Sequence, residues 1–353
     1  MTISIISFTE QGRLLSKRVK EALRKEATIC LYTKCSVYKN DRIYVPSSVR
    51  DWAGERIQEK SGLLFIGACA IAVRAVAPFL TDKLHDVPIL VMDEAGRYVI
   101  PILSGHMGGA NEIAKHIALK TGAEPVITTA TDLRQAFAVD LFAKKNGLSI
   151  VNKAGIAKVS SKVLAGKEVS MSIESGHEIK IEKSGLPLGV CLVPYPPDGS
   201  VDIVVTSENH VFDALILLKP KEYVFGIGCK RGKSFREIDA FISKKLTQLG
   251  ISTLQLFAIA SISQKEKEQG IIQWCQKEGI PFLTYTAEEL QEEEGTFIES
   301  SFVRSQVGVG NVCERAALKA CREGGKLIQK KEAENGMTIA VAQREWKVSF
   351  DEK

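Results

Sequence analysis

The chain has 353 residues, of which 45% are hydrophobic and 25% are charged. This length predicts two or three domains, and this composition allows a sizeable core and argues against intrinsic disorder. The formal net charge of +5 is too small to indicate a nucleic-acid-binding surface, but it is compatible with a small polyanionic ligand.

Targeting and redox features indicate a cytoplasmic protein. No apolar run approaches the length of a membrane span, and the first strand-like segment is followed at once by charged sequence, unlike a signal peptide. The eight cysteines form no CxxC pair and have no histidine at zinc-ligand spacing. Scattered single cysteines are typical of reduced thiols, so we expect neither disulfides nor a protein metal site.

The first 130 residues alternate strand-like and helix-like segments, which predicts an α/β domain with a mostly parallel sheet covered on both faces. The predicted strands are 3–8, 28–32, 63–66, 88–92, 98–103 and 125–129, and the predicted helices are 10–25, 47–60, 71–79 and 110–120. In such sheets ligands bind beyond the carboxyl ends of the strands. We therefore expect Gly67, His106 and the turn at 128–131 to share one end of the sheet.

The chemistry is predicted at a glycine-rich corner between the strand 98–103 and the next helix. The corner reads Ser104-Gly105-His106-Met107-Gly108-Gly109-Ala110-Asn111. Glycines allow positive φ and close approach of a ligand, and the N–H groups that start a helix can face an anion or a developing oxyanion. His106 is the side chain here that exchanges protons near neutral pH. A corner that serves only tight packing stays open as an alternative.

Two charged features of this region have competing interpretations. Arg74 lies in an apolar stretch and either binds a carboxylate or occupies the solvated face of a helix. Lys83, His85 and Asp86 are best explained as a solvated loop.

Residues 131–220 are predicted to form a smaller mixed α/β domain between the N-terminal domain, 1–130, and a C-terminal α/β domain, 221–353. Two helices are expected within 133–166, and strands at 169–173, 201–206 and 214–218. Prolines and glycines interrupt the rest. We find no candidate chemistry here and expect His177 and His210 to be exposed.

The C-terminal domain again alternates strands and helices. Strands are expected at 223–227, 254–260 and 280–285, helices at 234–249, 265–278 and 312–322, and a hairpin around Asn335-Gly336. The glutamate-rich stretch 288–294 is predicted to be a solvent-exposed charged segment.

Two features of this domain are candidate site elements. Lys230 and Arg231 lie in a glycine loop between a strand and a helix, which suits a carboxylate or phosphate ligand, although an exposed turn explains them equally well. Glu314 lies one turn into a helix. It either transfers protons or is simply favoured there by the helix dipole.

Several segments resemble one protein family. Residues 67–78 are similar to its GA-x-GI-x-VR-x-IAP segment, except that Ala70 stands where the family usually has glycine. Residues 104–111 resemble its LSGH-x-GGAN signature, residues 125–132 its P-x-ITTATD segment, and residues 226–232 and 307–318 also match. The family is that of the cobalt-precorrin-5A hydrolases of anaerobic cobalamin biosynthesis. The resemblance covers nearly the whole chain.

The resemblance implies a cytoplasmic hydrolase that opens the ring A δ-lactone of cobalt-precorrin-5A and releases acetaldehyde to give cobalt-precorrin-5B. From the chemistry, His106 would be the base, Glu314 a second proton-transfer group, and the N–H groups of Gly108, Gly109 and Ala110 an oxyanion site. Predicted substrate-binding residues are Gly67, Arg74, Ser104, Gly105, Gly108, Gly109, Asn111, Thr129, Lys230 and Arg231.

The resemblance also implies the cofactors and partners. Cobalt arrives inside the substrate, so no cofactor is expected. Nucleic acid and membranes are not expected partners, whereas neighbouring pathway enzymes or a second copy of the chain are the candidate partners. The alternative functions are a non-catalytic tetrapyrrole-binding protein of the same pathway and a nucleotide-dependent enzyme. The second lacks support, since both the dinucleotide fingerprint and the phosphate-loop motif are missing.

Overall fold

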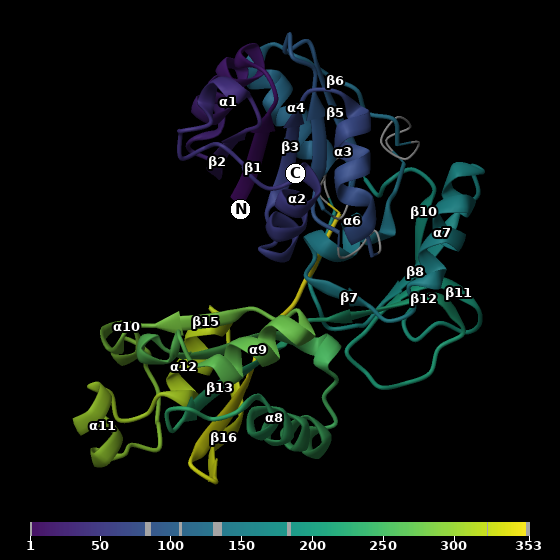
Figure 1. Cartoon of the computed structure of the whole chain (residues 1–353). Coiled ribbons are helices and arrows are strands. Elements are labelled where there is room, and N and C mark those ends of the chain that lie inside the picture. Colours follow the sequence, from purple (N-terminus) through teal and green to yellow (C-terminus); the bar gives the residue numbers. More distant parts are fainter. Residues whose placement is uncertain are drawn as a thin grey trace. The chain divides into compact units, whose positions relative to one another are not determined.

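The computed structural model describes residues 2–81, 86–105, 108–129, 136–181, 185–322 and 324–350. Predictions that fall on Lys83, His85, His106 and Thr131 concern residues outside these ranges. The chain separates into two compact units, Met1–Leu141 and Phe142–Lys353. Both units combine parallel-rich sheets with helices, which confirms the predicted fold class (Figure 1). The predicted domains 1–130, 131–220 and 221–353 stay a prediction.

A six-stranded sheet in the order β2-β1-β3-β4-β5-β6 forms the centre of the first unit. Its strands are β1 (Thr2–Ser7), β2 (Thr28–Thr33), β3 (Gly62–Ile66), β4 (Ile89–Met92), β5 (Tyr98–Leu103) and β6 (Glu124–Pro125). The main helices are α1 (Glu10–Leu23), α2 (Val49–Gln58), α3 (Cys69–Val76) and α4 (Ala110–Thr121), and α6 (Val139–Lys145) spans the boundary between the units.

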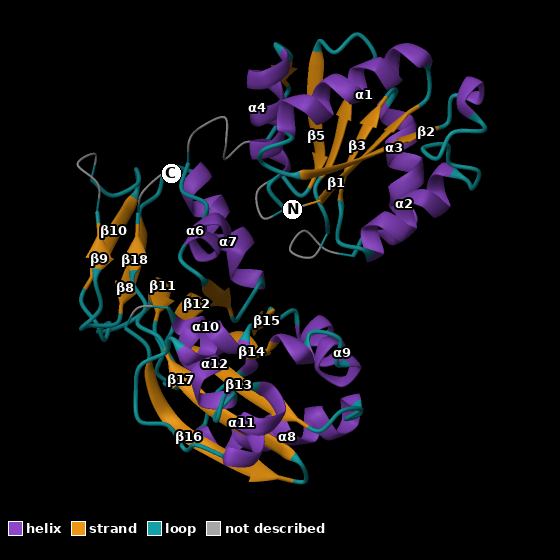
Figure 2. Cartoon of the chain, turned by 90° about the vertical axis from the view of Figure 1, so that its left-hand side faces the viewer, coloured by secondary structure: helices purple, strands orange, loops and turns teal. Residues whose placement is uncertain are grey.

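Different helices bury the two faces of this sheet, because successive residues of a strand point to opposite faces. Leu64 and Ile66 pack in one cluster with α1 and α4, whereas Leu63 and Phe65 pack in another with α2 and α3. Figure 2 shows the sheet between these helices. Burial on both faces explains why β3 is apolar throughout.

The direction of β5 contradicts the predicted single crevice. Strands β1 to β4 are parallel, but β5 runs antiparallel to β4, with Leu103 opposite Ile89 and Val99 opposite Met92. Ser104, which follows β5, therefore lies at the end of the sheet where β4 begins, opposite the end that holds Gly67. The physical reason is the short turn at 93–97, since a parallel connection needs a crossover of a dozen or more residues.

The first part of the second unit is a five-stranded sheet in the order β10-β8-β11-β12-β7. Its elements are β7 (Leu148–Ile150), α7 (Ala154–Leu164), β8 (Val169–Ile173), β10 (Val190–Val193), β11 (Val201–Val205) and β12 (Ala214–Pro220). Strand β7, which pairs antiparallel with β12, was not predicted. It is only three residues long, so alternation gives almost no signal for it.

The second part is a five-stranded sheet in the order β15-β14-β13-β17-β16. Its strands are β13 (Tyr223–Cys229), β14 (Leu256–Ile262), β15 (Phe282–Tyr285), β16 (Lys326–Glu334) and β17 (Met337–Gln343). Its helices are α8 (Phe235–Leu249), α9 (Gln269–Glu278), α10 (Ala287–Gln291), α11 (Ser301–Val307) and α12 (Cys313–Cys321). The predicted hairpin is confirmed, since β16 and β17 pair antiparallel around Asn335-Gly336.

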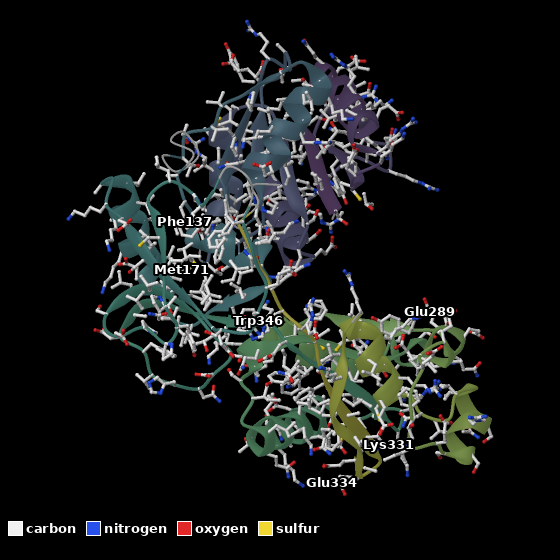
Figure 3. The ribbon with its side chains drawn as sticks, turned by 180° about the vertical axis from the view of Figure 1, so that it is seen from behind. Phe137, Met171, Glu289, Lys331, Glu334 and Trp346 are labelled. Carbon is white, nitrogen blue, oxygen red and sulfur yellow. The ribbon has the colours of Figure 1, made fainter. Side chains whose placement is uncertain are left out.

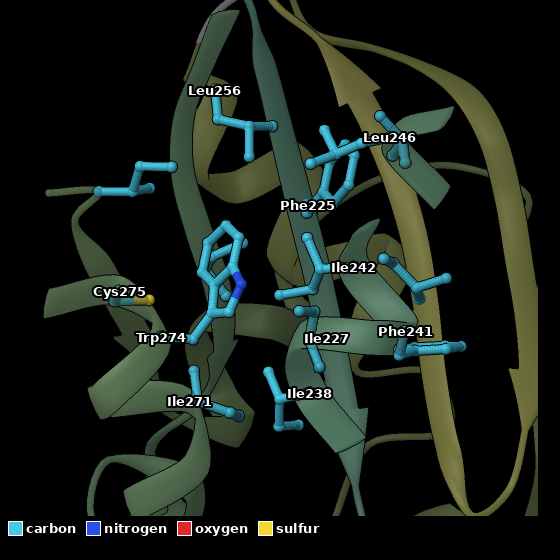
Figure 4. Close-up of a cluster of buried hydrophobic side chains, with 14 of the residues drawn as sticks. Phe225, Ile227, Ile238, Phe241, Ile242, Leu246, Leu256, Ile271, Trp274 and Cys275 are labelled. Carbon is cyan, nitrogen blue, oxygen red and sulfur yellow. The ribbon is translucent and has the colours of Figure 1, made fainter. Parts of the chain in front are cut away.

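Packing on the two faces of this sheet explains the burial of Trp274 and the glycine at position 226. Trp274 of α9 is buried with Phe225 of β13 and Ile238 of α8 (Figure 4). On the opposite face, a Cβ at Gly226 would lie 1.8 Å from the carbonyl oxygen of Cys313. Gly226 is therefore required for α12 to cross β13 closely, rather than for a ligand.

The C-terminal tail, residues 344–350, returns to the first part of the second unit. Strand β18 (Val348–Ser349) pairs parallel with β9 (Ile179–Lys180). Asn146 exchanges two hydrogen bonds with the backbone of Ser349, at 3.0 and 2.6 Å. Trp346, labelled in Figure 3 with Met171 of β8, is 9% exposed. The tail thus joins segments far apart in the sequence.

One histidine prediction needs correction. His177 was expected to be exposed, but its side chain is only 26% exposed because the tail covers it. His210 is exposed, as predicted. No helix within the described ranges is long and apolar enough to cross a membrane.

Candidate functional site

Three hydrogen bonds hold the corner that follows β5. The carbonyl oxygen of Ser104 accepts from the N–H of Ala110 at 3.0 Å, and that of Gly105 accepts from the N–H of Asn111 at 3.1 Å. The hydroxyl of Ser104 donates to the carbonyl oxygen of Asp86 at 2.8 Å. The first two bonds close the corner onto α4, and the third ties it to the segment that leads into β4.

The glycines of the corner are required for different structural reasons. A Cβ at Gly105 would lie 2.8 Å from Oδ1 of Asn111, and a Cβ at Gly108 would lie 2.3 Å from Cβ of Ser104. Gly109 has a φ of +82°, in the left-handed region that favours glycine, and caps α4. Packing therefore requires Gly105 and Gly108, as the alternative interpretation held, whereas Gly109 is required by its backbone conformation.

Asn111 connects the corner with the segment after β6. Its side chain is 2% exposed, and Nδ2 donates to Oγ1 of Thr129 at 3.2 Å. The two segments that carry predicted site residues therefore meet through one buried amide. Because Asn111 is buried, its side chain is not presented to a ligand in this structure.

The backbone bonding narrows the predicted oxyanion site. We expected the N–H groups of Gly108, Gly109 and Ala110 to be available, but that of Ala110 already donates to Ser104. An N–H that donates to a carbonyl at normal distance is not available to a developing oxyanion. The Ala110 N–H is therefore not a candidate donor to the oxyanion, and the N–H groups of Gly108 and Gly109 remain as candidates.

Gly67 lies at the other end of the sheet from Ser104. Its N–H donates to the carbonyl oxygen of Met92, the last residue of β4, at 2.9 Å. The chain then crosses to the opposite end through α3. It reaches Thr81, whose N–H donates to Oδ1 of Asp86 at 2.8 Å. Arg74 is exposed on the last turn of α3, in the second half of this crossing.

The glycine loop after β13 contains a carboxylate of the protein itself. Gly232 N–H donates to Oε1 of Glu268 at 2.9 Å, and Nζ of Lys265 donates to Oε2 at 3.0 Å. Burial alone would raise the pKa of the Glu268 carboxyl, but the Gly232 N–H and the Lys265 ammonium hold that pKa below its ordinary value. An amide expected to face a ligand anion therefore faces Glu268.

The two cations of this loop are exposed, as a ligand-binding role requires. Lys230 and Arg231 both lie at the surface, and the N–H of Lys230 donates to the carbonyl oxygen of Gly336 at 2.9 Å. The hairpin turn between β16 and β17 thereby fixes the loop that carries them.

Glu314 is fully buried, with an exposure of 0%. Its Oε2 accepts from the N–H of Ile298 at 3.0 Å and from Nδ2 of Asn311 at 2.7 Å, and its Oε1 accepts from the N–H of Lys331 at 2.7 Å. These bonds join α12 to the 293–300 segment and to β16. The geometry assigns Glu314 a structural role, and a role in proton transfer stays a prediction.

Sequence reasoning missed two residues of these sites. Asp86 was interpreted as part of a solvated loop, yet its backbone binds Ser104 and its side chain binds Thr81. Glu268 carried no motif, and only its position before α9 could have drawn attention to it. Within the described ranges, no group of three or more histidine, cysteine, aspartate or glutamate side chains could hold a metal ion.

Comparison with known proteins relates these segments to one family. Residues 51–132 match the family described as Cobalamin synthesis G N-terminal, and residues 223–342 match Cobalamin synthesis G C-terminus. The chain is 31% identical over 346 residues to the cobalt-precorrin-5A hydrolase of Salmonella typhimurium, which covers 96% of this chain and 97% of the relative. The chain belongs to the cobalt-precorrin-5A hydrolase family.

Two further members of the cobalt-precorrin-5A hydrolase family are similar along most of their length. The hydrolase of Priestia megaterium is 32% identical over 310 residues, which covers 84% of this chain and 82% of the relative. A probable cobalt-precorrin-5A hydrolase of Methanocaldococcus jannaschii is 27% identical over 352 residues, 97% of this chain and 99% of the relative. These matches confirm the family resemblance that the motifs indicated.

The matched ranges follow the cobalt-precorrin-5A hydrolase motifs. The N-terminal match, 51–132, includes Gly67 and the corner after β5, and the C-terminal match, 223–342, starts with β13 and ends within β17. The sheet around β8 and the C-terminal tail lie outside both matches.

Proposed function

We propose that the chain is a hydrolase of anaerobic cobalamin biosynthesis that converts cobalt-precorrin-5A into cobalt-precorrin-5B with release of acetaldehyde. The observation that carries this proposal is its identity of 31% with the Salmonella typhimurium cobalt-precorrin-5A hydrolase across nearly the full length of both chains. A carrier without activity is not favoured, since the full-length relatives are named as hydrolases.

The reaction has two steps. Water adds to the carbonyl carbon of the ring A δ-lactone, and the ester carbon–oxygen bond breaks to leave a carboxylate and a hydroxyl. The hydroxyl then loses its proton, and the adjacent carbon–carbon bond breaks. The carbon that carried the hydroxyl leaves as the carbonyl carbon of acetaldehyde. The electron pair of the broken bond passes into the macrocycle, and a proton then binds the macrocycle carbon that lost its substituent.

We place the first step at the corner between β5 and α4. His106 takes the proton from the attacking water, and the N–H groups of Gly108 and Gly109 stabilise the oxyanion. The bonds of Ser104 to Ala110 and Asp86 support this placement, because they fix the backbone next to His106. A fixed donor geometry is what lets a site stabilise charge without reorganising.

Substrate recognition is assigned to exposed cations. Arg74, Lys230 and Arg231 are exposed, and we propose that they bind acetate and propionate groups at the rim of the tetrapyrrole. Cobalt enters with the substrate, and the proposed steps use only side chains and backbone of the protein. We also propose a cytoplasmic location, which the eight free cysteines support.

The proposed function is tested with purified protein and cobalt-precorrin-5A under anaerobic conditions. Acetaldehyde is followed with a coupled alcohol dehydrogenase, and the product is identified by mass spectrometry. We expect one acetaldehyde for each tetrapyrrole converted. Binding of the substrate without acetaldehyde release would support the carrier instead.

A further inference from the structure

We propose that Asn111 is a positioning residue for the hydrolase reaction, which sets the distance between the corner 104–109 and the segment that ends at Thr129. The inference rests on the proposed function and adds to it a residue that acts without touching the substrate. It replaces the initial expectation that Asn111 binds the substrate directly.

Burial and bonding support this role. Asn111 is 2% exposed, its N–H donates to the carbonyl oxygen of Gly105 at 3.1 Å, and its Nδ2 donates to Thr129 Oγ1 at 3.2 Å. A buried amide is costly unless it is hydrogen-bonded, so these contacts strongly favour one arrangement of the two segments. Asn111 thus bonds the corner through its backbone and the Thr129 segment through its side chain.

Packing makes the arrangement stiff. Any Cβ at Gly105 would lie within 2.9 Å of both terminal atoms of the Asn111 side chain. The side chain therefore fills the space directly against the backbone of the corner at Gly105. A smaller side chain would leave this space empty and let the corner move.

Movement of the corner matters because both parts of the proposed catalytic machinery lie on it. His106 and the N–H groups of Gly108 and Gly109 must face one carbonyl group together. Misplacement of reacting groups by about 1 Å can lower a rate by about 10²-fold. A positioning residue of this kind changes kcat more than KM, because it does not contact the substrate.

The main test removes only the acceptor of the buried bond. Thr129→Val keeps the shape of the side chain and loses the hydroxyl, whereas Thr129→Ser keeps the hydroxyl. We expect Thr129→Val to lower kcat by about 10- to 100-fold with little change in KM. Thr129→Ser should retain most of the wild-type kcat. The matched control is Thr121→Val in the last turn of α4, which also removes a hydroxyl bond, to Ile117 at 2.8 Å. It should leave kcat unchanged.

A double variant tests whether the two residues act through one bond. Asn111→Ala should lower kcat at least as much as Thr129→Val, and combining both should lower it little further, because the same interaction is already lost. If Asn111→Ala does not fold, the Thr129 variants decide the question alone. Thermal melting of every variant separates loss of fold from loss of turnover.

Two results would overturn the proposal. An unchanged kcat in folded Thr129→Val would show that the bond does not position the corner. A raised KM with unchanged kcat would show that the Thr129 hydroxyl binds the substrate instead. Failure of the proposed function is distinguishable from both, because the wild-type protein would then release no acetaldehyde.

Discussion

The imidazole of His177 stacks on the indole of Trp346, with ring centroids 3.6 Å apart and planes inclined by 20°. Nε2 of the same imidazole lies 3.8 Å from Oε1 of Glu174. This stack, the pairing of β18 with β9 and the bonds between Asn146 and Ser349 attach the tail to segments that lie before β7 and after β8. The tail follows directly from β17, so it connects the two five-stranded sheets of the second unit.

We expect Trp346→Ala to destabilise the protein by about 3 kcal/mol, because replacing a buried tryptophan typically costs about 3–5 kcal/mol. Chemical denaturation gives the free energy of unfolding. Lys347→Ala is the control, since the Lys347 side chain is 66% exposed and should matter little. Equal effects of both substitutions would show that the tail does not contribute through Trp346.

For His106, a general base typically contributes about 10²–10⁴-fold, so His106→Ala should lower turnover by that order and leave the melting temperature unchanged. His106→Asn should be nearly as slow, because asparagine can bond water but cannot accept its proton. Activity should fall as pH drops through the histidine range, near 6.5 for an unperturbed side chain. Acetaldehyde release near the wild-type rate in His106→Ala would exclude His106 as the base.

Replacing Lys230 and Arg231 with alanine together should raise KM more than it lowers kcat, because rim carboxylates are bound equally in the ground and transition states. The effect should shrink at high salt, since both cations are exposed. Exposed Arg236 on α8 provides the matched control. An unchanged KM would show that the pair is only surface charge.

Glu314→Ala should be strongly destabilising, because it leaves the donors of Ile298, Asn311 and Lys331 without their partner in the core. Each unpaired buried donor costs about 1–3 kcal/mol, so we expect a loss of about 3 kcal/mol or more. Exposed Glu292 is a suitable control for substitution with alanine. Wild-type stability together with lost turnover would instead support the proton-transfer role.

The lowered pKa of Glu268 predicts a pH-dependent stability. A carboxyl group whose folded pKa is depressed stabilises the fold above its unfolded pKa, about 4.3, and this stabilisation is lost as pH falls through the folded value. Glu268→Gln should therefore melt below wild type at pH 7, and the gap should close below about pH 4. Glu266→Gln, at a neighbouring exposed position, should show no such trend. A gap that is constant from pH 3 to 8 would contradict the prediction.

Local sequence determined much of what these experiments address. Gly122 ends α4 in the left-handed conformation, and Ser234 caps α8 through a box with Glu237. Such signals are readable because the interacting groups lie within about four residues of each other. The glycines of the corner were identified for the same reason, although whether packing or backbone conformation required each one was not visible.

The direction of β5 shows where local sequence signals stop and tertiary structure decides. The connection at 93–97 is too short for a parallel crossover, yet the alternation of strands and helices favoured a parallel strand. Only pairing of Leu103 with Ile89 places Ser104 and Gly67 at opposite ends of the sheet. Tertiary structure alone decided that Asn111 meets Thr129, that Glu268 accepts from Gly232, and that Trp346 covers His177. Each of these contacts joins segments whose separate patterns say nothing about one another, so their meeting depends on how the sheets pair and pack.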